Sequence, residues 1–123
     1  ERPIAGAIRA AIGDVELTRN AGKPSHNYPV QVIQLGDAVT LAALGSETTV
    51  DYALRLKREI QSPMVWVAGY SNDYSGYVPG RRVALEGGYE AANDFTPDVE
   101  DRIVGRVHAL RKSIDPTKKS DKE

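Results

Sequence analysis

The alternation of apolar and polar residues predicts a β-hairpin in the first half of the chain. Val30–Leu35 and Ala38–Leu44 are two apolar runs, and a Gly-Asp pair at positions 36–37 separates them. Two strand-like runs joined by two turn residues are typical of a hairpin. The second run is apolar at almost every position, so we expect a central strand that is covered on both faces. Before the hairpin, we expect Ile8–Leu17 to be mostly extended and Thr18–Tyr28 to be a polar loop.

The segment after the hairpin has the spacing of a helix that lies between two strands. Within Val50–Ile60, apolar side chains recur every three or four positions, and charged side chains occupy the opposite face. Thr48 or Thr49 can cap this helix, and Pro63 follows its end. Met64–Tyr70 is a further short apolar run. A strand, a helix and a strand in this order predict a βαβ crossover with parallel strands.

A loop and a second helix are predicted for the rest of the chain. Tyr70–Gly88 is rich in glycine, tyrosine and proline, which is typical of a loop. We expect Thr96 to cap the final helix, with Pro97 in its first turn. Its apolar positions fall at helical spacing: Val99, Ile103, Val104, Val107 and Leu110. The expected fold class is therefore α/β, with a mixed sheet, a βαβ crossover and a C-terminal helix.

Composition and charge exclude several classes of protein. The chain has 123 residues, which is the size of one domain, and 16 basic and 17 acidic side chains give a net charge of −1. This balance argues against binding to nucleic acid or to an anionic membrane. The absence of cysteine excludes disulfides and thiolate ligands. No apolar run reaches the length of a transmembrane segment. The chain begins at Glu1 without a signal-peptide pattern, which we interpret as a mature end or a fragment.

The residues that follow two of the predicted strands offer candidate chemistry. Glu47 lies just beyond the run that ends at Leu44, and three of the six tyrosines lie in the loop at 69–79, beyond the next strand. Ligands bind outside the carboxyl ends of the strands in open α/β sheets. A carboxylate that faces phenols at such an edge suits a metal site or acid–base chemistry. The simpler alternatives are that Glu47 interacts with a helix dipole and that the loop is a packing surface.

The two histidines form no zinc-binding pattern by their spacing. Zinc sites use three or four ligands drawn from histidine, cysteine and carboxylates. His26 lies in the predicted polar loop and is expected to face solvent. His108 belongs to the final helix and is expected to be packed or half-exposed. The sequence also lacks a nucleophile elbow and a phosphate-binding loop.

Three short motifs carry more specific information. Ala68–Val78 reads AGYSNDYSGYV, Leu44–Thr49 reads LGSETT, and Gly88–Asn93 reads GYEAAN. The first motif is similar to the G-L-S-N-x-Y-S-G-Y stretch of the neutral/alkaline (non-lysosomal) ceramidase family. The other two resemble that family's P-G-E-F-T-T and R-Y-E-A-A-S segments. The three motifs occur in the same order as in the family and cover Val30–Asn93, roughly half of the chain.

The resemblance implies a zinc-dependent amidohydrolase of sphingolipid metabolism, which cleaves the amide of a lipid N-acyl substrate. It implies that Glu47 and Tyr77 are zinc ligands, and that the upstream part of the same protein supplies two further histidine ligands. Tyr89 matches the family's tyrosine that stabilises the oxyanion. The cofactor implied is therefore Zn²⁺. Because bacterial members of the family are typically exported, the resemblance also implies a secreted or periplasmic protein.

Departures from the family pattern leave alternatives open. Ser46 replaces the glycine before the glutamate, and Val78–Val83 replaces an acidic, tyrosine-rich segment that borders the substrate. We interpret residues 1–114 as the C-terminal portion of a larger α/β hydrolytic domain and 115–123 as a charged, disordered tail. Such a fragment alone is expected to be inactive. The alternatives are a non-catalytic binding or structural domain with the same fold, and a complete module that binds a partner through its tyrosines.

Overall fold

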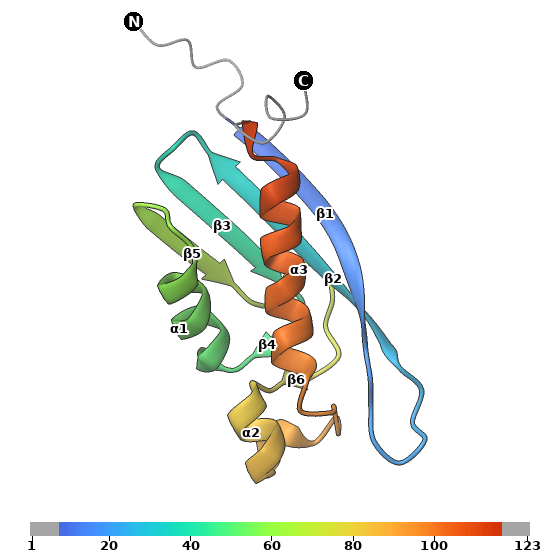
Figure 1. The fold of residues 1–123 in the computed structure, drawn as a ribbon. Coiled ribbons are helices and arrows are strands. Elements are labelled where there is room, and N and C mark those ends of the chain that lie inside the picture. The colour runs from blue at the N-terminus through green and yellow to red at the C-terminus, as the bar shows by residue number, and fades with distance from the viewer. Residues whose placement is uncertain (1–7, 117–123) are drawn as a thin grey trace, which may run out of the picture.

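A mixed four-stranded sheet forms the centre of the fold (Figure 1). The computed structural model describes residues 8–116. The strands are β1 (Ile8–Leu17), β2 (His26–Leu35), β3 (Val39–Leu44) and β5 (Met64–Ala68), in the spatial order β1-β2-β3-β5. The first three strands pair antiparallel, and β3 and β5 pair parallel. The predicted α/β class and mixed sheet are therefore confirmed, as is the extended conformation of Ile8–Leu17.

One face of the sheet packs against the two longer helices. The C-terminal helix α3 (Val99–Ser113) lies across β1 and β2, and α1 (Val50–Glu59) packs beside β5 on the same side (Figure 1). Inward positions of the strands alternate with outward ones, as the two-residue period of a strand requires. The core joins inward side chains of the sheet to the apolar stripe of α3: Leu17, Tyr28, Val30, Val32, Val99, Ile103, Val104 and Val107. No helix of the described part, residues 8–116, is long and apolar enough to cross a membrane.

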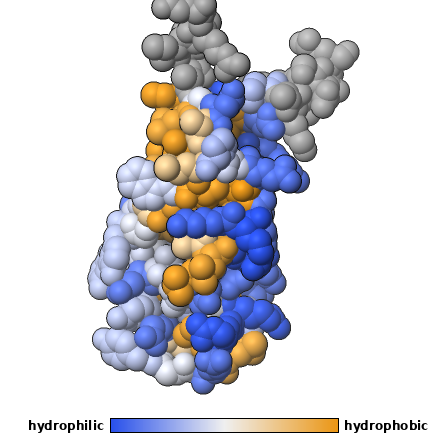
Figure 2. All heavy atoms as spheres, turned by 90° about the vertical axis from the view of Figure 1, so that its left-hand side faces the viewer, coloured by the Kyte–Doolittle hydropathy of each residue, from blue (hydrophilic) through white to orange (hydrophobic). Residues whose placement is uncertain are grey.

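The other face of the sheet carries exposed apolar side chains. Ile8 and Ile12 on β1 are 70% and 64% exposed, and Met64 and Trp66 on β5 are 58% and 59% exposed. Figure 2, which views the side of β5 and α1, shows apolar side chains gathered in a band with polar side chains on both flanks. β3 is central in the sheet, as predicted, but its outward residues Val39 and Leu41 are only half-buried among the described residues.

The hairpin differs from its prediction by one residue. Leu35 pairs with Val39, so the turn includes Ala38 as well as the Gly-Asp pair. The amide of Ala38 donates to the carbonyl oxygen of Leu35 at 3.3 Å, and Gly36 has a φ of 56°. The connection therefore has three residues, and Ala38 belongs to the turn and not to the strand. Gly36 takes the left-handed conformation at the start of this turn, which glycine adopts without steric strain.

The βαβ crossover β3–α1–β5 is confirmed, and Thr49 occupies the N-cap position of α1. Its hydroxyl does not cap the helix, however. The hydroxyl accepts a hydrogen bond from the amide of Gly80 at 2.9 Å and donates to the carboxylate of Asp51 at 3.0 Å. Thr49 thereby ties the start of α1 to a distant segment of the chain.

The predicted loop 70–88 contains regular structure. It holds β6 (Tyr77–Val78) and α2 (Arg81–Glu86), and the short 3₁₀ helix η1 (Tyr89–Ala91) follows. The strand β6 pairs in parallel with β4 (Glu47–Thr48), so it exists through a tertiary contact that no local pattern reveals. The six residues of α2 are too few to show a helical period in the sequence.

The start of the final helix also differs from its prediction. The helix begins at Val99, and Asp98, not Thr96, is the N-cap residue. The amide of Val99 donates to the carbonyl oxygen of Thr96 at 3.1 Å, which forms a turn just before the helix. The side-chain hydroxyl of Thr96 bonds to the Asp98 carboxylate, so Thr96 supports the N-cap residue but does not occupy the N-cap position itself. The domain boundary predicted at residue 114 stays a prediction, and residues 117–123 of the predicted tail lie outside the described residues.

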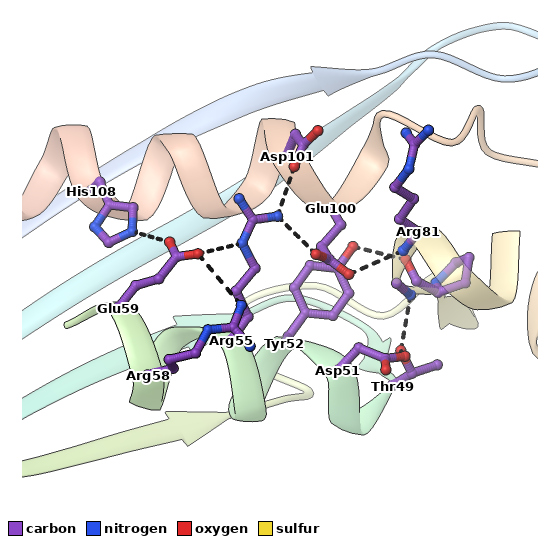
Figure 3. A network of polar contacts seen from close by, with 12 residues as sticks. Thr49, Asp51, Tyr52, Arg55, Arg58, Glu59, Arg81, Glu100, Asp101 and His108 are labelled. Atoms are coloured by element: carbon purple, nitrogen blue, oxygen red, sulfur yellow. Dashed lines mark hydrogen bonds and ion pairs between the residues drawn. The ribbon is translucent and has the colours of Figure 1, made fainter.

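A network of charged side chains joins α1 to α3 (Figure 3). The Arg55 guanidinium donates to Glu59, Glu100 and Asp101, each at 2.7 Å. Glu59 also bonds to His108 on α3 at 2.8 Å. The bonds from His108 and then Arg55 lower the pKa of Glu59 below its usual value. His108 is half-exposed, as predicted, and its role within the described residues is to join the two helices.

Candidate functional site

The predicted site residues Glu47 and Tyr77 lie directly opposite each other. They are register partners in the β4–β6 pair, beyond the carboxyl ends of β3 and β5. The amide of Glu47 donates to the carbonyl oxygen of Gly76 at 2.9 Å, and the amide of Thr49 donates to that of Val78 at 3.2 Å. Residues paired in register carry their side chains on the same face of the ribbon. The carboxylate and the phenol therefore belong to one surface.

Tyr89, the third predicted site residue, lies against Tyr77. Their ring centroids are 5.1 Å apart and the ring planes are inclined by 70°. This edge-to-face geometry is the favoured one for two aromatic rings. Gly87 and Gly88, at φ values of 80° and 103°, let the chain turn sharply between α2 and η1, so that Tyr89 reaches the β6 strand. The ring of Tyr89 remains 75% exposed, so its hydroxyl is open to a ligand.

Tyr70 is a further site residue, and the sequence analysis gave it no role of its own. The interaction with the Glu47 carboxylate is the largest cause that raises the pKa of Tyr70, to about 12. Its ring stacks on that of Tyr74, with centroids 5.9 Å apart and planes inclined by 13°. One sequence signal was available: Tyr70 stands where the family motif has leucine. A tyrosine there adds a donor beside the carboxylate.

The electrostatics of this group favour neutral phenols in the absence of a cation. Partial burial, followed by the negative charge of Glu47, raises the pKa of Tyr77 above its ordinary value. Ionising Tyr77 beside Glu47 would place two negative charges close together, which costs free energy. A cation bound between the two oxygens would reverse this effect.

A cleft of about 410 Å³ opens beside Glu47 and Tyr77. Thr49 at the start of α1 lines one side, and residues of α2 line the other. The α2 residues include Arg82, which bonds to Glu86 at 3.3 Å and approaches Asp51 at 3.5 Å. The chain therefore has a hollow that could hold a substrate next to the paired carboxylate and phenol.

The histidines do not complete a metal site within the described part of the chain. His26 is at the start of β2 and is half-buried, which corrects the prediction of a solvent-facing loop residue. Its Nε2 lies 3.0 Å from the Asp73 carboxylate and 3.3 Å from the Ser75 hydroxyl. Residues 8–116 contain no cluster of three or more histidine and acidic side chains that could hold a metal. Glu47 and Tyr77 thus offer two oxygen donors, which fit part of a zinc shell.

Comparison with known proteins gives a likeness to a solved structure. No family model and no curated protein matches the chain. Among solved structures, the chain is similar to a ceramidase complexed with C2, with a TM-score of 0.51 and 26% sequence identity. The neighbour is a ceramidase. The likeness covers 69% of this chain and 15% of the ceramidase chain, so this chain spans a small part of that enzyme. It associates the α/β fold described above with a hydrolase.

Proposed function

We propose that this chain forms part of a zinc-dependent amide hydrolase of ceramidase-like type. The observation that carries the proposal is the register pairing of Glu47 with Tyr77, with Tyr89 against the latter. These residues come from three separate motifs, each similar to a ceramidase segment. The likeness of the fold to a ceramidase supports the amide hydrolase part of this proposal.

The three residues have two roles in the proposed reaction: two would hold the metal, and one would stabilise developing charge. When bound, Zn²⁺ supplies a Lewis acid that lowers the pKa of water to near neutrality, which makes a nucleophile for an amide carbonyl. Glu47 and Tyr77 would hold the metal through a carboxylate and a phenol oxygen. The Tyr89 hydroxyl would donate a hydrogen bond to the oxygen of the amide carbonyl as negative charge develops there. Its exposure at the edge of Tyr77 leaves it free to approach that oxygen.

The remaining parts of the proposal concern the complete protein. Two histidines from a part of the protein outside this chain would complete the zinc shell, since zinc requires about four ligands. The cleft between Glu47 and α2 would hold a lipid N-acyl amide. Ceramide is one such amide, and Arg82 and Val83 in the segment that departs from the family pattern would influence which amide fits. We also propose that the protein is exported, as bacterial ceramidases typically are.

The experiment is to measure bound zinc and amide hydrolysis in the complete protein with Glu47→Gln. This substitution keeps the shape of the side chain and removes its charge, so we expect at least a 10-fold loss of zinc affinity and of turnover. Glu86→Gln is the matched control for zinc affinity, because Glu86 lines the same cleft but is highly exposed and bonds only to Arg82 among the interactions described. Full zinc occupancy with unchanged turnover in Glu47→Gln would contradict the proposal. A complete protein without zinc would favour a binding domain.

A further inference from the structure

The backbone bends at Gly76, immediately before the strand β6 that carries Tyr77. Gly76 has a φ of 92°, a conformation that side chains rarely adopt. The side chain of Asn93 fills this bend: its Nδ2 donates to the carbonyl oxygen of Ser75 at 2.8 Å and to that of Tyr77 at 3.0 Å. Both partners are carbonyl oxygens, which only accept hydrogen bonds. The amide of Asn93 must therefore present its NH₂ group, which has two protons for the two bonds.

Asn93 is itself held from the opposite side. The backbone carbonyl oxygen of Asn93 accepts a hydrogen bond from Nε of Arg19 at 2.8 Å. Arg19 and Phe95 form a β-bridge, and the amide of Asn20 donates to the carbonyl oxygen of Asp94 at 2.9 Å. The segment around Asn93 is thus fastened to the chain just beyond β1, and its side chain is a fixed support for the bend.

The β4–β6 pair needs such support. Each strand has only two residues, and a pair this short is marginal without further contacts. On one side of the bend, the Ser46 hydroxyl accepts a hydrogen bond from the amide of Ser75 at 2.8 Å. On the other side, Asn93 binds the two carbonyl groups. Asn93 also lies two residues beyond η1, which carries Tyr89.

We propose that Asn93 is a positioning residue that keeps Tyr77 aligned with both Glu47 and Tyr89. One side chain connects the backbone of β6 to the segment that follows Tyr89, so it fixes the relative placement of the two phenols. The consequence for zinc and for catalysis rests on the function proposed above. The consequence for the geometry of the β4–β6 pair does not.

The test of the geometry is hydrogen exchange in the complete protein with Asn93→Asp. A carboxylate has the same shape but cannot donate, and it repels the two carbonyl oxygens. We expect the amides of Glu47 and Thr49, which bond to the backbone of β6, to exchange at least 10-fold faster. The amides between β2 and β3 should keep their protection, which shows that the variant is folded. Asn72→Asp is the matched control, since Asn72 lies in the loop that leads into β6 and its side chain bonds to Gln31 instead of to the β6 backbone. Unchanged exchange at Glu47 and Thr49 would overturn the proposal.

The functional arm separates this proposal from the function on which it rests. In a protein whose zinc affinity depends on Glu47, we expect Asn93→Asp to weaken zinc binding about 10-fold or more, with Asn72→Asp unchanged. Asn93→Ser keeps one hydrogen-bond donor, so its zinc affinity should lie between those of Asn93→Asp and Asn72→Asp. Unchanged zinc affinity in Asn93→Asp would overturn the positioning role in that protein. If Glu47→Gln has no effect on zinc, the proposed function fails, and the exchange result still decides whether Asn93 supports the bend.

Discussion

Glu47 and Tyr77 face each other across a parallel pair of strands that are each only two residues long. Their meeting depends on the β3–α1–β5 crossover, because β4 follows β3 and β6 follows β5. The crossover makes β3 and β5 parallel neighbours, so the segments beyond their carboxyl ends emerge at one edge of the sheet. The hydrophobic pattern that builds the sheet thus also brings the carboxylate to the phenol.

The titration of Tyr70 tests the arrangement around Glu47. In the metal-free protein, we expect Tyr70 to titrate with a pKa of about 12, because the interaction with the Glu47 carboxylate favours the protonated phenol. In Glu47→Gln, the pKa should fall towards the ordinary value of about 10. The measurement is a pH titration by tyrosine NMR, with Tyr70→Phe to assign the resonance. A pKa that is the same in both proteins would contradict this effect of Glu47 on Tyr70.

The same interaction between Tyr70 and Glu47 has a defined effect on stability. The folded state binds the Tyr70 proton more tightly than the unfolded state does, because the folded pKa is the higher one. The stabilisation is therefore fully present below the unfolded pKa and is lost as pH rises through the folded pKa. The difference in unfolding free energy between the parent and Tyr70→Phe should shrink over this alkaline range. A difference that grows with pH would contradict the assignment.

Ser46 provides a test of backbone strain beside the site. It is fully buried, has a φ of 56°, and its hydroxyl is bonded to the amide and the hydroxyl of Ser75. Ser46→Ala keeps the strained conformation and loses the bonds, which should cost about 1–3 kcal/mol of unfolding free energy. Ser46→Gly loses the same bonds but relieves the strain, so it should be less destabilising by about 1 kcal/mol. Chemical denaturation measures both values, and equal losses would contradict the strain.

Much of the fold could be predicted from the sequence, because its elements follow local patterns. The β2–β3 hairpin, α1, β5 and α3 each have an apolar period of their own, and the structure contains all four. The strand β6 could not be predicted, because two residues have no period and the strand exists only through its pairing with β4. The helix cap at Asp98 was missed because Thr96 and Asp98 are both good cap residues and only the backbone decides between them.

The sequence named three candidate residues that lie together in the structure, but it did not reveal their contacts. Strand ends and motifs pointed to Glu47, Tyr77 and Tyr89, and the structure brings these three residues together. The interaction of Tyr70 with Glu47 and the two bonds from Asn93 to the β6 segment depend on where loops fold back in space. His26 was assigned to a loop because the sequence around it is polar, but β2 begins at this residue and places it beside Asp73.

Tyr52 tests the support beneath the site. Its hydroxyl is buried and donates to the carbonyl oxygen of Pro79 at 2.8 Å, just after β6. Tyr52→Phe leaves this carbonyl without its partner, so we expect a loss of about 1–2 kcal/mol of unfolding free energy. Tyr74→Phe is the control, because the ring of Tyr74 is 69% exposed and should contribute little through its hydroxyl. Equal stability of Tyr52→Phe and the parent would contradict the contribution of this bond.

Tyr89→Phe tests the proposed oxyanion donor. The substitution keeps the ring contact with Tyr77 and removes only the hydroxyl. If that hydroxyl stabilises charge in the transition state, kcat for amide hydrolysis should fall roughly 100-fold while KM changes little. Zinc affinity should not change, because the hydroxyl is not proposed as a ligand. An increase in KM with an unchanged kcat would instead assign Tyr89 to substrate binding.

Zinc located by anomalous scattering in crystals of the complete protein tests the central proposal most directly. We predict a zinc peak between the Glu47 carboxylate and the Tyr77 hydroxyl, with the carboxylate oxygen about 2.0–2.2 Å from the metal. The Tyr70 hydroxyl should remain within hydrogen-bonding distance of Glu47 in that structure. A zinc peak at another place, or a Glu47 carboxylate that binds only Tyr70 in zinc-saturated crystals, would contradict the account.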